Sequence, residues 1–141
     1  MTHSDLNELD SVDIFEAIRD IKDPEHPCTL EELNVIGEAS VLIRPVEAHG
    51  MKKQILIEIT PTVKHCSLVT DISLCILTRL RRMFGEQLLN NYKIDLKVAS
   101  GSHENEADVI KQINDKERVA AALENPLIMQ VVENCIGNIA H

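Results

Sequence analysis

Hydrophobic and polar positions alternate with two different periods along the chain, and each period predicts one kind of element. Apolar residues three and four positions apart predict helices, and this spacing begins near residue 10, at residue 67 and again after residue 105. Strict alternation predicts strands over residues 39–46, 54–59 and 92–98. The last helical region is divided into three pieces, so the predicted order is α-β-β-α-β-α-α-α.

Capping and breaking residues set the predicted boundaries of the helices. Asp10 or Ser11 caps the first helix, and Asp23 ends it because a residue that precedes proline is disfavoured in a helix. The long central helix runs from a cap at Ser67 to a stop at Gly85. Later helices start at Asp115 and at Asn125–Pro126, where a cap is followed by proline.

These elements predict a small α/β fold of the α+β type. Pro45 marks the first strand as an edge strand, and the first two strands form a hairpin. The apolar stripe of the central helix is expected to cover that hairpin; it comprises Leu68, Ile72, Ile76, Leu80 and Met83. We expect one two-layer domain over residues 10–138, with helices on a mixed three-stranded sheet, after a mobile segment at residues 1–9.

Composition narrows the setting in which this domain works. Two Phe, one Tyr and no Trp among 141 residues mean that the core is aliphatic. The chain shows neither an apolar run of about 18 residues nor a signal-peptide pattern, so we expect a cytoplasmic protein without a membrane span. The four cysteines form no C-x-x-C pair and are expected to be free thiols.

Charge is distributed unevenly along the chain. The formal net charge is −9, and residues 1–34 hold ten acids against two bases, which gives that segment −8. Nucleic acid is an unsuitable direct ligand because binding its phosphates requires a clustered basic face. The one local excess of base comprises Lys64, Arg79, Arg81 and Arg82, and it is typical of residues that complement a helix C-terminus.

The candidate chemistry lies where the second strand leads into the long helix. Cys66 stands there beside His65 and Lys64, and both the helix N-terminus and the nearby cations favour a thiolate. Such a thiolate is a nucleophile and a soft-metal ligand, so Cys66 and His65 are the candidate metal ligands. The alternative is a buried, inert thiol, and the residues alone favour the reactive interpretation only mildly.

Other chemical interpretations have less support. A nucleophile–base pair of Cys66 and His65 lacks an evident third, orienting group, and adjacent residues seldom face each other. Cys75 and Cys135 lie on apolar helix faces, which indicates packing. The loop histidines are more typical of solvated residues; they are His26, His49 and His103.

Three segments in order resemble one known family. They are IRDIKDPEHP with TLEEL at 18–27 and 29–33, TPTVKHCS at 60–67, and DKERVAAALEN at 115–125. These segments are similar to those of the eukaryotic cytosolic iron-sulfur assembly component two family, within the domain-of-unknown-function fifty-nine superfamily. The resemblance extends over residues 12–136.

The resemblance implies a non-enzymatic targeting subunit. With a WD-repeat propeller protein, and in some members a HEAT-repeat adaptor, it would deliver iron-sulfur clusters to cytosolic and nuclear apoproteins. Cys66 matches the family's reactive cysteine, and Asp23, Glu25 and Thr60 match supporting motif positions. The implied cargo is a transiently held cluster, and zinc would be an adventitious occupant of the same thiol. One cysteine cannot complete a four-thiolate set, so further ligands must come from another chain.

Finer features of the resemblance lead to further expectations. Cys75, Ile113–Asn114 and Asn125–Pro126 look more like the family branch linked to iron homeostasis. Lys64 replaces the family's usual proline. The family also implies a domain-swapped homodimer, exchanged through the C-terminal helices. Two alternatives stay open: a cysteine-dependent enzyme that uses Cys66 and His65, and a purely structural interaction module.

Overall fold

The computed structural model describes residues 9–45, 53–61, 66–85, 88, 91–99 and 111–137. Its elements, in chain order, are α1 (Ser11–Ile18), the 3-10 turn η2 (Glu38–Ser40), β1 (Val41–Pro45), β2 (Lys53–Ile59), α2 (Cys66–Phe84), β3 (Tyr92–Val98), α5 (Lys116–Leu123) and α6 (Pro126–Ile136). Residues 111–113 are also helical. The predicted class and element order are confirmed.

The sheet is mixed, with strand order β1-β2-β3. β1 and β2 are antiparallel and form the predicted hairpin, and β1 is an edge strand as Pro45 indicated. β3 runs parallel to β2. A parallel pair requires a crossover connection, and α2 is the element between these two strands.

The register places most of the apolar residues of the three strands on one face, with Leu42 and Leu56 on the other. Val41 pairs with Ile57, which in turn pairs with Leu96, and these three side chains are buried. The opposite face is more polar: Arg44 Nε donates to Gln54 Oε1 at 2.6 Å, and Gln54 Nε2 donates to Asp95 Oδ2 at 2.5 Å. This alternation is the reason that the described helices gather on one side of the sheet.

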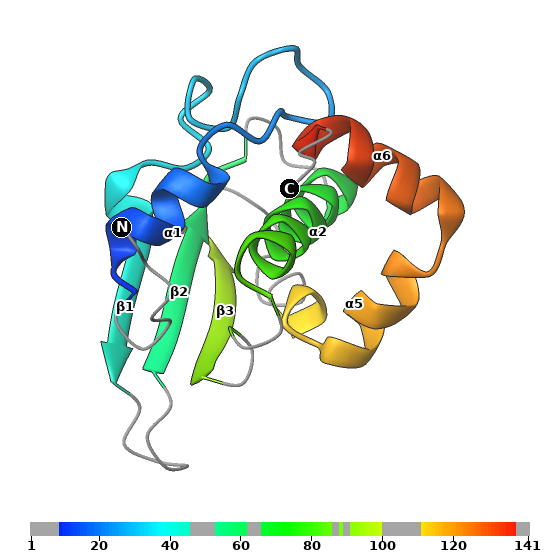
Figure 1. Cartoon of the computed structure of the whole chain (residues 1–141). Helices are drawn as coiled ribbons and strands as arrows, with labels where there is room; N and C mark the ends of the chain where they lie inside the picture. The colour runs from blue at the N-terminus through cyan, green and yellow to red at the C-terminus, as the bar shows by residue number, and fades with distance from the viewer. Residues whose placement is uncertain are drawn as a thin grey trace.

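The helices form a layer with α2 at its centre. α1 packs against β1 and α2, and α2 packs against α6. Figure 1 shows α2 between α1 on one side and the α5–α6 pair on the other. In the described part of the chain, no helix combines the length and the apolar character that a bilayer crossing requires.

The first helix starts as predicted but ends earlier. Asp10 and Asp13 form a reciprocal capping box, with N–H···O distances of 3.0 and 3.1 Å. Leu9 before the cap and Ile14 in the first turn are both buried, as in a hydrophobic staple. The predicted end at Asp23 is wrong, because the helix stops at Ile18 and Leu30 N–H then donates to Ile21 C=O at 2.8 Å.

The central helix begins at Cys66, so Ser67 is inside it and is not its cap. Gly85 ends it as predicted, with φ of 77° and an N–H···O bond of 2.8 Å to Arg81 C=O. Four residues of the predicted stripe are buried: Leu68, Ile72, Ile76 and Leu80. Met83 is 49% exposed, so its assignment to the stripe was wrong.

Both predicted starts in the C-terminal region are confirmed. The Asp115 side chain accepts from Glu117 and Arg118 N–H, and that of Asn125 accepts from Leu127 and Ile128 N–H. Pro126 occupies the first turn of α6. Asn114, which precedes the Asp115 cap, forms two hydrogen bonds with Leu96 of β3. Its Oδ1 accepts from Leu96 N–H at 2.9 Å, and its Nδ2 donates to Leu96 C=O at 2.8 Å.

Candidate functional site

Cys66 is the first residue of α2, and backbone hydrogen bonds fix the end of β2, which precedes it in the chain. Thr60 N–H donates to Val35 C=O at 2.9 Å, and Ala99 N–H donates to Ile59 C=O at 2.9 Å. Because α2 begins at Cys66, the backbone N–H at this position contributes to the positive end of a 19-residue helix. The side chain of Cys66, together with the whole of residues 62–65, lies outside the described residues, and these include His65 and Lys64.

The acidic turn comprises residues 22–29 and contains Asp23 and Glu25, two of the residues predicted to support the site. A backbone bridge between Lys22 and Thr29 joins its two ends. Within it the Asp23 side chain is fully buried, and its Oδ1 accepts from Glu25 N–H at 2.7 Å and contacts His26 Nδ1 at 3.2 Å. The second oxygen, Oδ2, has no hydrogen-bond partner within the described residues. Glu25 itself is exposed.

This turn lies against the helical layer. Lys22 N–H donates to Cys135 C=O at 2.9 Å, which attaches the turn to the end of α6. Figure 1 shows the segment after α1 extending along the top of the view toward the C-terminal end of α6. Burial raises the pKa of the Asp71 carboxyl, and the charge of Glu25 raises it further. Glu25 therefore acts electrostatically on the N-terminal half of α2.

Asp71 lies past the first turn of α2. No acidic residue lies in the first turn of α2, because the helix begins at Cys66. Its proximity to the acidic turn depends on long-range packing, so no local sequence signal could have shown it.

The buried cysteines form a pair that the sequence did not reveal. Cys75 is fully buried and Cys135 is 7% exposed, which confirms that both pack in the core. Both are free thiols. The hydrogen bond with Cys135, together with burial, raises the pKa of the Cys75 thiol. The same hydrogen bond lowers the pKa of Cys135.

The structure thus brings together some of the predicted site residues. Asp23 and Glu25 lie near the α2–α6 contact, whereas Thr60 is exposed at the end of β2. Among residues of the described ranges, no three His, Cys, Asp or Glu side chains are grouped as a metal would require. The predicted metal ligands, Cys66 and His65, have side chains outside those ranges, so that prediction is untested.

Comparison with known proteins gives the family. No family model matches the chain. It is 49% identical over 128 residues to Protein AE7 of Arabidopsis thaliana, covering 91% of this chain and 76% of that protein. It is 42% identical to cytosolic iron-sulfur assembly component 2B of Mus musculus, over 92% of this chain and 74% of that protein.

A further relative has almost the same length as the matched region. The MIP18 family protein FAM96A of Dictyostelium discoideum is 41% identical, over 92% of this chain and 93% of its own. These identities do not distinguish the family's branches, so the branch assignment stays a prediction. Identities above 40% that extend over nine-tenths of the sequence confirm the family resemblance seen in its three motifs: the chain belongs to the MIP18 family, that of the cytosolic iron-sulfur assembly component 2 proteins.

Proposed function

We propose that this protein is a targeting subunit of cytosolic iron-sulfur cluster assembly. It helps to deliver clusters to cytosolic and nuclear apoproteins and has no catalytic activity of its own. The observation that carries the proposal is the 42% identity, over 92% of the chain, to a protein named for this assembly process. A WD-repeat propeller protein is the expected partner, with a HEAT-repeat adaptor as a further candidate.

Cys66 is the proposed contact with the cargo. It stands at the N-terminus of α2, where the open N–H groups of the first turn favour an anionic sulfur. A thiolate is the usual ligand that a protein gives to cluster iron. Since one thiolate leaves a cluster incompletely held, the remaining ligands come from the partner or the client, which suits a handover better than storage.

The acidic turn supports the proposal as a rigid neighbour of this helix. Asp23 is buried and holds the turn through Glu25 N–H and His26. The turn is attached to α6 through Cys135 and acts electrostatically on α2 through Asp71. We assign Asp23, Glu25 and Thr60 to positioning the segment around Cys66, with no direct contact to the cargo.

Anaerobic reconstitution tests the proposal. The full chain is incubated with ferrous iron and sulfide, with and without the propeller protein, and cluster binding is followed by visible absorption. Cys66→Ser is expected to lose the cluster absorption, because an alcohol does not replace a thiolate on iron. Client maturation is expected to fail with this variant.

Cys28→Ser is the matched control, since Cys28 is only partly buried and lies in the acidic turn. It is expected to retain the parent's cluster absorption. Full absorption and normal client maturation with Cys66→Ser would contradict the proposal and favour a structural interaction module. Covalent trapping of Cys66 by an electrophilic substrate, with turnover in the absence of iron, would indicate an enzyme.

A further inference from the structure

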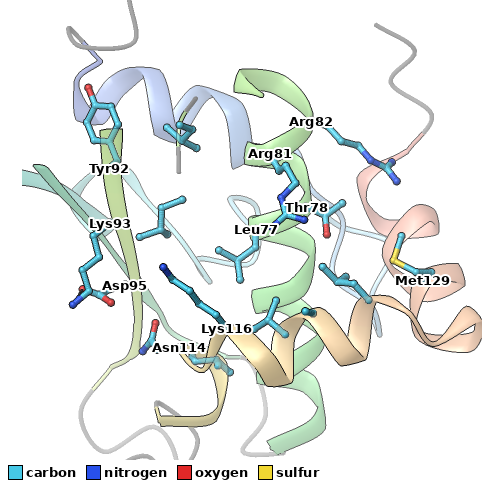
Figure 2. A pocket seen from close by; sticks show the side chains of 16 residues that line it. Leu77, Thr78, Arg81, Arg82, Tyr92, Lys93, Asp95, Asn114, Lys116 and Met129 are labelled. Atoms are coloured by element: carbon cyan, nitrogen blue, oxygen red, sulfur yellow. Dashed lines mark ion pairs between the residues drawn. The ribbon is translucent and has the colours of Figure 1, made fainter. Parts of the chain in front are cut away.

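A pocket of about 670 Å³ lies at the other end of α2, away from Cys66. It is enclosed by the C-terminal half of α2, by β3, by residues 113–114 and by helices α5 and α6. Figure 2 shows α5 crossing α2, with side chains from both helices extending into the space between them. The volume falls within the range of about 300–1,000 Å³ that is typical of small-molecule sites.

Most of the wall is aliphatic. Its apolar part includes Leu77, Leu88, Ile94, Ile113, Val119 and Leu123. Helix α5 contributes no buried residue, so its apolar side chains are only half-covered by the protein. The wall therefore offers apolar surface that an apolar ligand could cover.

The charged groups of the pocket are mainly cationic. Arg82 is neutralised by Glu133, with which it forms a two-point ion pair. Lys93 and Asp95 line the pocket from β3, and Lys93 Nζ lies 4.0 Å from Asp95 Oδ2, so these two charges offset each other. Arg81 and Lys116 have no ion-pair partner within the described residues, and Figure 2 shows them reaching toward the pocket from α2 and α5. Both side chains are exposed to solvent, and as the unpaired charges of this wall they favour an anionic ligand over a cationic one.

Thr78 provides a separate sign of an unfilled polar contact. It lies in the wall, is 7% exposed, and its hydroxyl has no hydrogen-bond partner within the described residues. A buried hydroxyl without a partner is costly. Threonine in a helix has two accessible χ1 rotamers, so a rotation can direct this hydroxyl toward a bound acceptor.

We propose that this pocket binds a long-chain carboxylate, with its aliphatic chain against Leu77, Ile94 and Val119 and its headgroup at Arg81 and Lys116. The apolar wall disfavours nucleotides and sugars, whose polar groups would be left unpaired. The two cations disfavour a neutral or cationic amphiphile. This binding activity is independent of the proposed role of Cys66.

Calorimetric titration with dodecanoate tests the proposal, with dodecyltrimethylammonium as the probe of equal chain length and opposite charge. Dodecanoate is expected to bind one molecule per chain. Lys116→Glu and Arg81→Glu are each expected to weaken its binding by about tenfold or more, the effect of losing a charge-assisted hydrogen bond. Lys111→Glu is the charge control, because Lys111 is exposed and outside the wall.

A steric pair of variants tests the location. Ala120 and the adjacent Ala121 are both exposed, but only Ala120 lines the pocket. Ala120→Phe is expected to abolish dodecanoate binding, and Ala121→Phe is expected to leave it unchanged. Equal binding of the cationic amphiphile, or equal binding by the two phenylalanine variants, would overturn the proposal. If Ala120→Phe does not unfold cooperatively, the comparison of Lys116→Glu with Lys111→Glu decides.

Discussion

Arg79 is the residue that connects most of the helical layer. It is 4% exposed in the middle of α2, where its Nη1 donates to Ala17 C=O at 3.0 Å and to Asp20 at 2.6 Å. Its Nη2 donates to Ile136 C=O at 2.5 Å. The charge therefore caps the C-terminal ends of both α1 and α6. The predicted role of the arginine cluster at helix C-termini is confirmed for this residue, although the helices concerned are not its own.

Arg79→Met is expected to lower the free energy of unfolding by about 2–4 kcal/mol, because two buried carbonyls lose a charged donor. Urea denaturation followed by circular dichroism measures the change. Arg82→Ala is the control, and it is expected to cost less than about 1 kcal/mol because the Arg82–Glu133 pair is exposed to solvent. Equal losses for the two variants would contradict the role assigned to Arg79.

Asp71 gives a prediction on pH dependence. Burial and Glu25 raise its pKa above the ordinary value of 3.8, so the folded protein holds this proton more tightly than the unfolded chain. The corresponding stability is present below pH 3.8 and is lost as the pH rises through the folded-state pKa. Asp71→Asn is therefore expected to be more stable than the parent at pH 7.

The advantage of Asp71→Asn is expected to shrink as the pH falls through the folded-state pKa toward 3.8, because the parent carboxyl of the folded protein then becomes neutral as well. Thermal unfolding at pH 7 and at pH 4 measures this trend. An advantage that is the same at both values would show that the charge of Asp71 is not its cause.

At the scale of elements, the end of α2 depends on one backbone conformation. Gly85 has a φ of 77°, in the region where residues with a Cβ are strained. Its N–H closes the last turn onto Arg81 C=O. The chain then leaves the helix toward β3, so this conformation sets the direction of the crossover.

Gly85→Ala is expected to destabilise the protein by about 1 kcal/mol, because alanine must take up the left-handed conformation. A Cβ at this position would contact no other atom within 4 Å, so the cost is one of backbone conformation. Gly37→Ala is a matched control, since Gly37 has φ of −146° and its Cβ would also meet nothing. Chemical denaturation of both variants measures the difference in the free energy of unfolding. A Gly85→Ala variant as stable as the parent would show that alanine is not strained in this backbone conformation.

At the scale of the whole molecule, the C-terminal arm (residues 115–137) is attached unevenly. α6 is fastened through Ile136 to Arg79, through Glu133 to Arg82 and through Cys135 to Lys22. α5 has no buried residue and borders the 670 Å³ pocket. This arrangement suits the domain-swapped homodimer implied by the family resemblance, because α6 could make the same contacts on a partner copy.

A charge-reversal pair tests the exchange of the arm. Arg82→Glu faces Glu133 with a like charge, and Glu133→Arg faces Arg82 in the same way. In a swapped heterodimer of the two variants both contacts become attractive, whereas in unswapped copies neither does. After joint unfolding and refolding, native mass spectrometry is expected to find an excess of heterodimer. A statistical mixture or monomers alone would contradict the swap.

Sequence alone determined the features that depend on residues near one another in the chain. Asp10, Asn125–Pro126 and Gly85 act on backbone groups within four residues of themselves, so their caps and stops were predictable. The alternation in β2 and β3 reflects local strand geometry, and it gave the buried face correctly. The family, too, followed from three contiguous motifs.

Only the tertiary structure decided the properties that arise between distant segments. The early end of α1, the exposure of Met83 and the raised pKa of Asp71 each depend on what packs beside the residue. The contact between Cys75 and Cys135 joins two helices that no spacing rule relates. The stretch around Cys66 was therefore identified from the sequence. The acidic turn near Asp71 and the separate pocket at the far end of α2 arise only from the packing of segments that are distant in the chain.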